Sequence, residues 1–285
     1  MQPADFERNI LVNGEYSENF PVMDRGLHYG HGLFETIAIK QGQCQHWDRH
    51  MTRLIKGCSQ LSMTPPDLSL LYKEATQLSA QADQIGQAVL KIIYTCGSGG
   101  RGYRTPDETQ SNRLIILSEW PDYPDTNTQT GIVLRLCETR LSSNPALAGL
   151  KHLNRLEQVL ARSEWSDPDI AEGLMLDGHG QVIEGTMSNL FFVKNDTLCS
   201  PELTQSGVKG IMRDYVLELA EKLGIHTYID DFTPADVFQA NEVFLTNSLI
   251  GIWPVNKILS DEPVRYNLPG RITSILIDQM NHKNQ

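Results

Sequence analysis

Residues 148–160, with the sequence AGLKHLNRLEQVL, constrain the fold of this chain more than any other segment. The lysine of this segment, Lys151, lies among small and apolar residues, and apolar residues recur behind it at helical spacing. This pattern predicts an amphipathic helix with Lys151 at its N-terminus. A helix dipole disfavours a cation at that end. A lysine placed there is therefore less typical of a solvated surface charge and more consistent with a functional role.

A glutamate, Glu184 in the segment VIEG, follows a predicted hairpin further along the chain. A helix N-terminus and partial burial both lower the pKa of a lysine amine and make it a nucleophile. A pyridine nitrogen that must stay protonated needs a carboxylate beside it. Lys151 and Glu184 together therefore indicate a Schiff-base lysine for pyridoxal phosphate (PLP) and the carboxylate partner of its ring. Either residue alone is more often a solvated surface charge.

The run AGLKHLNRLEQVLARSE is similar to the lysine motif of the fold-type IV PLP enzymes. This family includes D-amino-acid and branched-chain aminotransferases and 4-amino-4-deoxychorismate lyase. The resemblance extends from about Ile10 to about Ile258, with several motifs in the family's order. It implies that Lys151 is catalytic and binds PLP, that Glu184 contacts the pyridine nitrogen, and that the chain forms a homodimer with a two-domain α+β fold.

Several further residues are expected to bind the cofactor phosphate. The segment SGVKGIMR places a glycine-containing turn at a helix start, where free N–H groups and the dipole attract anions. The resemblance implies that the backbone amides of Ile211 and Met212 bind the phosphate, with Asn247 and Ser248 completing the site. It also implies a phosphate role for Arg53 in HMTRL, and the planar fork of an arginine suits that role. An ordinary helix start and a surface arginine are the alternatives.

Two segments bear on the substrate. The glycine-rich loop GSGGRGY resembles an element that places an arginine, here Arg101, near the substrate carboxylate, and a flexible surface loop is the alternative. Its spacing does not fit a Walker or dinucleotide loop. The segment DRGLHYGHGLFET matches the family's early motif, but His31 replaces an acidic residue of D-amino-acid aminotransferases. Phe34 replaces a tyrosine that often lines the aminotransferase site, so we expect Phe34 at the substrate. His28 and His31 are expected to be structural.

The resemblance implies a PLP-dependent elimination that converts 4-amino-4-deoxychorismate to 4-aminobenzoate and pyruvate, a step of folate biosynthesis. Lys151 would remove the proton from the amine-bearing carbon of the substrate. The missing phenol at Phe34 argues against transamination. Two alternatives remain open: a D-amino-acid or branched-chain aminotransferase, which needs a keto-acid acceptor, and a non-catalytic PLP-binding protein on the same scaffold.

The periodicity of the chain predicts an α+β structure with strands and helices mixed along the sequence. Strands are expected at 10–12, 33–39, 88–95, 114–117, 131–136, 173–176, 181–184, 189–193 and 242–245, and helices at 47–61, 68–82 and 211–223. We also expect a tight turn at Asn13–Gly14, an N-cap at Asp67 for the second helix and a C′ glycine at Gly224 after the third. The polar, proline-bearing stretch WPDYPDTNTQ predicts a linker. We therefore expect an N-terminal domain at 1–120, a linker at 121–130 and a C-terminal domain with the PLP lysine at 131–285.

The composition limits the partners of the chain. A net charge of −11 disfavours nucleic acid and anionic membranes but allows an anionic small-molecule substrate in a local arginine cluster. No apolar run reaches the roughly 20 residues of a membrane span, and the start MQPADFERN does not resemble a signal peptide. Five scattered cysteines without a C-x-x-C pair indicate free thiols in a cytoplasmic protein without a metal site.

Overall fold

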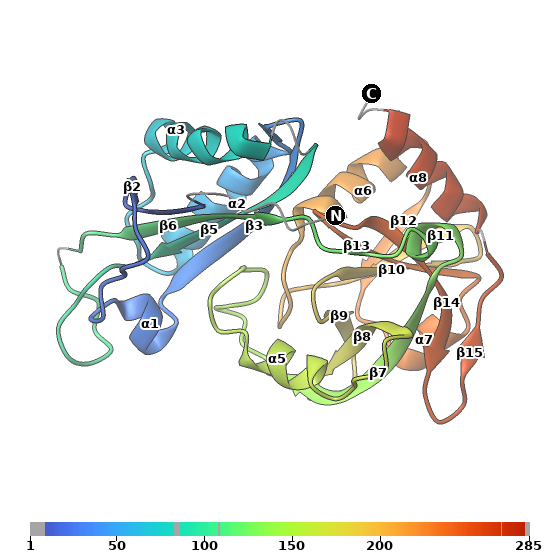
Figure 1. Ribbon diagram of the computed structural model, residues 1–285. Coiled ribbons are helices and arrows are strands. Elements are labelled where there is room, and N and C mark those ends of the chain that lie inside the picture. The colour runs from blue at the N-terminus through green and yellow to red at the C-terminus, as the bar shows by residue number, and fades with distance from the viewer. Residues whose placement is uncertain (1–8, 83–85, 108, 269, 283–285) are drawn as a thin grey trace. The chain divides into compact units, whose positions relative to one another are not determined.

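The computed structural model describes residues 9–82, 86–107, 109–268 and 270–282 (Figure 1). By internal contacts the chain divides into two compact units. The first comprises Met1–Asp122 and Leu150–Asn154, and the second comprises Tyr123–Gly149 and Arg155–Gln285. Each unit has its own sheet and its own helices. Within these described ranges no helix combines the length and apolar character needed to cross a membrane.

The first unit is built on a six-stranded antiparallel sheet in the order β2-β1-β6-β5-β3-β4. Its strands are β1 (Ile10–Val12), β2 (Glu15–Tyr16), β3 (Gly32–Lys40), β4 (Gln43–Cys44), β5 (Gln87–Thr95) and β6 (Asn112–Glu119). Asn13 and Gly14 join β1 to β2 with φ values of 52° and 92°, a left-handed turn that asparagine and glycine tolerate best. The four strands expected in this region are confirmed.

Two helices, α2 (Trp47–Gln60) and α3 (Leu68–Ser79), cover the same face of this sheet, as Figure 1 shows. Both contribute buried apolar side chains to one core with β3, β5 and β6. The Asp67 side chain caps α3 by accepting from the amides of Ser69 and Leu70. Both predicted helices are confirmed, but the last turn of the second is a separate 3₁₀ helix, η1 (Ala80–Ala82). A short helix, α1 (Arg25–Tyr29), precedes β3.

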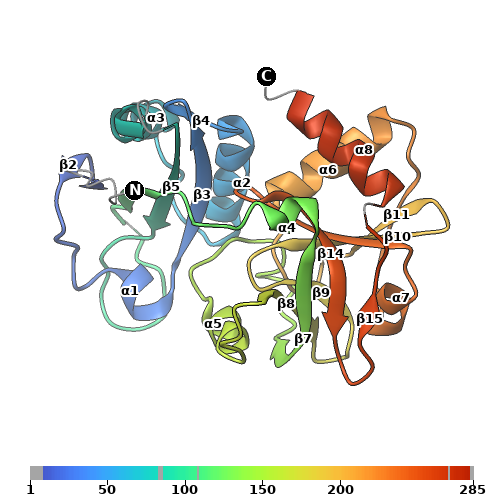
Figure 2. The same cartoon turned by 45° about the vertical axis from the view of Figure 1, so that its right-hand side comes forward.

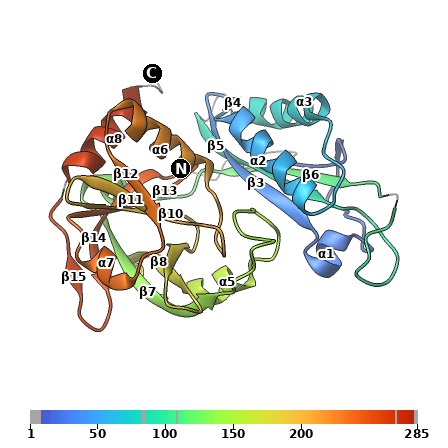
Figure 3. The same cartoon turned by 180° about the vertical axis from the view of Figure 1, so that it is seen from behind.

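The second unit contains a nine-stranded mixed sheet, in the order β12-β11-β10-β13-β14-β7-β8-β9 with β15 paired to β14. Its strands are β7 (Ile132–Leu141), β8 (Ile170–Asp177), β9 (Val182–Gly185), β10 (Asn189–Lys194), β11 (Thr197–Pro201), β12 (Thr227–Asp230), β13 (Glu242–Asn247), β14 (Gly251–Leu259) and β15 (Val264–Arg265). Figure 3 shows the curl of this sheet from behind. At the tight turn between β9 and β10, the amide of Gly185 donates to the Ser188 carbonyl at 2.7 Å.

Two long helices, α6 (Ile211–Lys222) and α8 (Arg271–His282), lie side by side against β10, β13 and β14, as Figure 2 shows. A separate apolar core lies among the strands and α7 (Pro234–Phe238). The remaining helices are α4 (Thr126–Gln129), inside the expected linker, and α5 (Leu156–Arg162). The predicted helix at 211–223 is confirmed, and Gly224, with φ 68°, follows its C-cap as expected.

Candidate active site

Lys151 lies in an extended segment that pairs with β3. The amide of Phe34 donates to the Lys151 carbonyl at 3.0 Å, and the amide of Leu153 donates to the Gly32 carbonyl at 3.0 Å. The helix α5 begins only at Leu156. The prediction of a helix that starts at Lys151 is therefore wrong, because pairing with β3 fixes this backbone in an extended form. A helix dipole acts mainly within its first turn, so it does not explain the chemistry of this lysine.

The pairing with β3 places Lys151 in the first unit. Leu150–Asn154 packs with the first unit, whereas the sequence places Lys151 in the C-terminal domain. Gly30 ends α1 with φ 65°, and a Cβ atom there would lie 2.0 Å from Oδ1 of Asn154. A glycine is thus required where α1 meets the segment after the lysine.

Phe34 is the aromatic neighbour of the candidate lysine. The Nζ atom of Lys151 lies 4.3 Å from the centroid of the Phe34 ring, and Nζ of Lys91 lies 5.3 Å from it. These are cation–π distances, so the half-buried ring helps to fix the lysine amine. Phe34 therefore lies next to the group that the sequence identifies as catalytic.

Arg53, expected at the phosphate, forms a bidentate ion pair with Glu35 of β3. Its Nε donates to Oε1 at 2.9 Å, and its Nη2 donates to Oε2 at 2.5 Å. His50, one turn earlier on α2, contacts Oε2 through Nδ1 at 2.5 Å. Glu35 and His50 lie in the segments DRGLHYGHGLFET and HMTRL, but no role was predicted for either residue. The signal for Glu35 was that it is the only carboxylate in the mainly apolar strand GLFETIAIK.

The charges of this cluster are strongly coupled. Burial alone would raise the pKa of Glu35, but the Arg53 charge and the hydrogen bonds from His50 and Arg53 outweigh it and lower the pKa to about 2. Burial lowers the pKa of His50 despite the Glu35 carboxylate, and the charges of Arg53 and Lys151 act in the same direction. His50 is therefore neutral and donates from Nδ1. Among the described residues its buried Nε2 has no hydrogen-bond partner.

Glu184 lies on β9 in the second unit, with only 5% of its surface exposed. Its Oε2 accepts from the amide of Val208 at 2.8 Å and from Nδ2 of Asn189 at 3.4 Å. A second buried carboxylate, that of Glu172, accepts from the side chains and amides of the turn between β9 and β10. Glu172, for which the sequence predicted no role, thereby supports the strand that carries Glu184.

At the N-terminus of α6 the backbone amides are not covered by a capping side chain. Gly210 is the N-cap, without a side-chain cap, and a Cβ atom there would lie 2.0 Å from Oδ1 of Asn189. The side chains of Ile211 and Met212 are buried in the core, so these residues offer only their amides to a ligand. An anion suits this position.

The turn after β13 contains the other two expected phosphate residues. Oδ1 of Asn247 accepts from the amides of Leu249 and Ile250 at 2.8 and 3.0 Å, and its Nδ2 donates to the Met187 carbonyl. The side chain of Asn247 thus holds its own turn, and Ser248 lies half-buried within it. Arg101, expected at the substrate, is exposed in the loop after β5.

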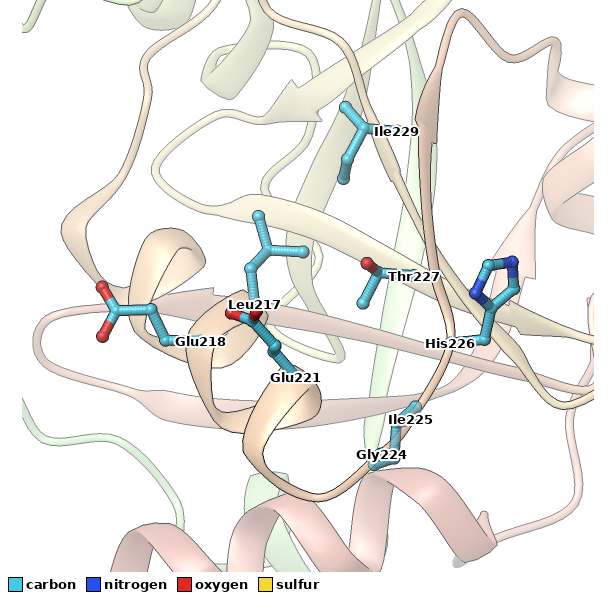
Figure 4. Close-up of a pocket in the computed structure, with 8 residues that line it drawn as sticks. All are labelled: Leu217, Glu218, Glu221, Gly224, Ile225, His226, Thr227 and Ile229. Atoms are coloured by element: carbon cyan, nitrogen blue, oxygen red, sulfur yellow. The ribbon is translucent and has the colours of Figure 1, made fainter.

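A shallow pocket of about 580 Å³ lies elsewhere in the second unit, between the last turns of α6 and β12 (Figure 4). Figure 4 shows Glu218 and Glu221 on α6 and Thr227 and Ile229 on the strand that follows. None of the residues assigned to the cofactor or substrate lines it. Its two carboxylates make it unsuited to a phosphate.

Comparison with known proteins identifies a family model, amino-transferase class IV, that matches residues 32–258. Aminodeoxychorismate lyase of Vibrio harveyi is 37% identical over 95% of this chain and 98% of its own. The crystal structure of 4-amino-4-deoxychorismate lyase from Pseudomonas aeruginosa superposes with a TM-score of 0.90, at 45% identity over 96% of this chain and 98% of the other. A putative branched-chain-amino-acid aminotransferase of Methanocaldococcus jannaschii is 30% identical over 87% of each chain.

Proposed function

We propose that this chain, which belongs to the amino-transferase class IV family, converts 4-amino-4-deoxychorismate to 4-aminobenzoate and pyruvate with PLP as its cofactor. The observation that carries the proposal is the full-length likeness to two lyases of this name, at 37% and 45% identity. The likeness to the Methanocaldococcus aminotransferase is weaker, at 30%. Phe34 supports the same choice, because it lacks the phenol that the related aminotransferases often carry.

The donor groups of the chain fit PLP. The cofactor presents a phosphate, a pyridine nitrogen and an aldehyde, which need an anion site, a carboxylate and an amine. The glycine-capped N-terminus of α6, the buried Glu184 and Lys151 provide one of each. When bound, PLP supplies a ring that withdraws electrons from the carbon bonded to the substrate nitrogen.

Lys151 and Glu184 perform the proton chemistry in this proposal. When PLP is bound, Lys151 would hold it through Nζ, and once the substrate amine had taken its place Nζ would act as the base that removes the proton from the amine-bearing carbon. The ring face of Phe34, 4.3 Å away, keeps Nζ in place. Glu184, fixed by the Val208 amide, keeps a proton on the pyridine nitrogen. Cleavage of the carbon–oxygen bond to the enolpyruvyl group would then leave an aromatic ring, which provides the driving force. The released enolpyruvate would take up a proton and become pyruvate.

In this proposal the phosphate would be bound by Arg53, by the amides of Ile211 and Met212, and by the turn of Asn247 and Ser248. Because the Asn247 side chain is already engaged in its turn, we assign its contribution to the backbone. Arg101, in the loop after β5, pairs with a substrate carboxylate, and Phe34 contacts the substrate beside Lys151.

We also propose that the enzyme is a cytoplasmic homodimer. The described cysteines are all free thiols, and four of the five are buried, which suits a reducing compartment. Large apolar side chains are exposed around α1, at Val22, Met23 and Leu27, and such clusters are typical of subunit contacts. Size-exclusion chromatography with light scattering should give twice the 32.0 kDa mass of the chain. A fully active monomer would contradict the proposal.

The function is tested by substrate preference. Purified protein is incubated with aminodeoxychorismate and, separately, with D-alanine or a branched-chain amino acid plus 2-oxoglutarate. We expect rapid formation of 4-aminobenzoate in the first reaction and little keto-acid exchange in the others. The reverse pattern, with aminodeoxychorismate inert, would identify an aminotransferase instead.

A further inference from the structure

Arg25 lies at the centre of a contact network that the proposed chemistry does not use. Although it opens the short helix α1, only 3% of its surface is exposed. Its Nη1 donates to the carbonyl of Gly102 at 3.1 Å, and its Nη2 donates to the carbonyl of Tyr103 at 2.8 Å. Both carbonyls belong to the loop after β5, in the two residues that follow Arg101. We call residues 97–104 the arginine loop.

The arginine loop folds around the Arg25 side chain. At the start of the loop, the Arg25 amide donates to the Gly97 carbonyl at 2.9 Å. A Cβ atom on Gly99 would lie 2.9 Å from Cδ of Arg25, so only glycine allows this approach. The Tyr29 ring lies under the guanidinium at 4.9 Å and against the Tyr103 ring at 5.4 Å. Arg25 therefore contacts the loop at its beginning, middle and end.

His31 fixes the orientation of the guanidinium. Nε of Arg25 donates to Nδ1 of His31 at 3.2 Å, so Nδ1 accepts and the ring proton lies on Nε2. Nε2 in turn donates to the Leu61 carbonyl at 2.9 Å. With Nε directed at His31, both Nη atoms are directed at the loop. The substitution of His31 for an acidic residue thus preserves an acceptor for Arg25.

We propose that Arg25, oriented by His31, is a positioning residue that holds the arginine loop in place and presents Arg101 to the substrate. A loop with glycines at 97, 99, 100 and 102 would otherwise lose much conformational entropy when it binds a ligand. Ordering the loop in advance reduces that cost and strengthens substrate binding. The role of Arg101 rests on the proposed function. The contacts between Arg25 and the arginine loop, which we call the clamp, are those of the structure itself.

The clamp is tested by limited trypsin digestion of the full-length holoenzyme, with cleavage after Arg101 and Arg104 followed by mass spectrometry. Arg25→Met removes the donors, and His31→Leu removes the acceptor. We expect both to speed cleavage in the arginine loop by about tenfold, because cleavage requires local opening. His31→Asn places an amide oxygen near the position of Nδ1 and should restore wild-type resistance. Arg104→Lys is the matched control, because it keeps a trypsin site in the arginine loop and changes an exposed side chain that pairs with Asp107. It should be cleaved at the wild-type rate.

Steady-state kinetics separate positioning from a purely structural role. Arg25→Met and His31→Leu should raise KM for aminodeoxychorismate by about tenfold with a much smaller change in kcat, because the lost order is restored on binding. His31→Asn should keep the wild-type KM. Equal cleavage rates in all variants, or faster cleavage with an unchanged KM, would overturn the proposal. A wild-type enzyme without lyase turnover would refute the proposed function and the role of Arg101, while the cleavage rates would still decide whether the clamp exists.

Discussion

Replacing Glu35 with glutamine should destabilise the first unit by an amount that depends on pH. The carboxylate is 1% exposed, and it neutralises Arg53 and accepts from His50. Removing one member of a buried ion pair leaves the other charge uncompensated, which costs about 3–5 kcal/mol. The lowering of the Glu35 pKa from 4.5 to about 2 corresponds independently to roughly 3 kcal/mol.

The sign of the pH dependence follows from the direction of that shift. Because the pKa of Glu35 is depressed in the folded state, its stabilisation is complete above the unfolded value of 4.5 and is lost as the pH falls toward 2. The difference in unfolding free energy between wild type and Glu35→Gln should therefore narrow by about 0.2 kcal/mol at pH 5 and about 0.8 kcal/mol at pH 4, relative to pH 7.

Urea unfolding of the PLP-free proteins at pH 7, 5 and 4, followed by circular dichroism, measures this difference. Glu119→Gln, an exposed carboxylate at the end of β6, is the matched control and should stay within about 0.5 kcal/mol of wild type. A difference below about 1 kcal/mol at pH 7, or one that does not change with pH, would contradict the assignment of a strongly coupled buried pair.

Three further predictions concern the cofactor. Borohydride reduction of the yellow holoenzyme should attach the cofactor to a tryptic peptide that contains Lys151, and a label on another lysine would refute its role. Glu184→Gln should retain PLP, because the Val208 amide can still donate to an amide oxygen, yet kcat should fall by at least about 100-fold; near wild-type turnover would be incompatible with the proposal. Arg53→Lys, which keeps a charge beside Glu35 but loses the fork, should weaken PLP binding by about tenfold. Pyridoxal, which lacks the phosphate, should bind wild type and Arg53→Lys with equal affinity. If the variant lost affinity for PLP and for pyridoxal to the same extent, Arg53 would not bind the phosphate.

Features set by local chemistry were predictable from the sequence. The Asp67 cap, the Asn13–Gly14 turn and the Gly224 position each depend on a few neighbouring residues, and the structure confirms them. The strand β14 was missed because Pro254 and Asn256 interrupt its apolar pattern. Its pairing with β13 and β7 comes from distant parts of the chain.

In the candidate site, too, features that depend on a local motif were predictable, and features that depend on distant pairing were not. The motif led to Lys151 and Phe34, which the structure places in contact. The helix expected at Lys151 was wrong because pairing with β3 overrides local periodicity. The cluster of Glu35, His50 and Arg53 joins a strand to a helix. The lone carboxylate of β3 marks an unusual buried charge, but no local pattern identifies its partners on α2.

The stoichiometry of the reaction with aminodeoxychorismate alone tests the central claim most directly. Elimination returns the cofactor to its starting form in every cycle, whereas transamination leaves it in the amine form until a keto acid arrives. With no keto acid present, we predict many turnovers per subunit and release of pyruvate and 4-aminobenzoate in equal amounts. Product formation that stops after one equivalent per subunit, and resumes on addition of 2-oxoglutarate, would contradict the assignment of a lyase.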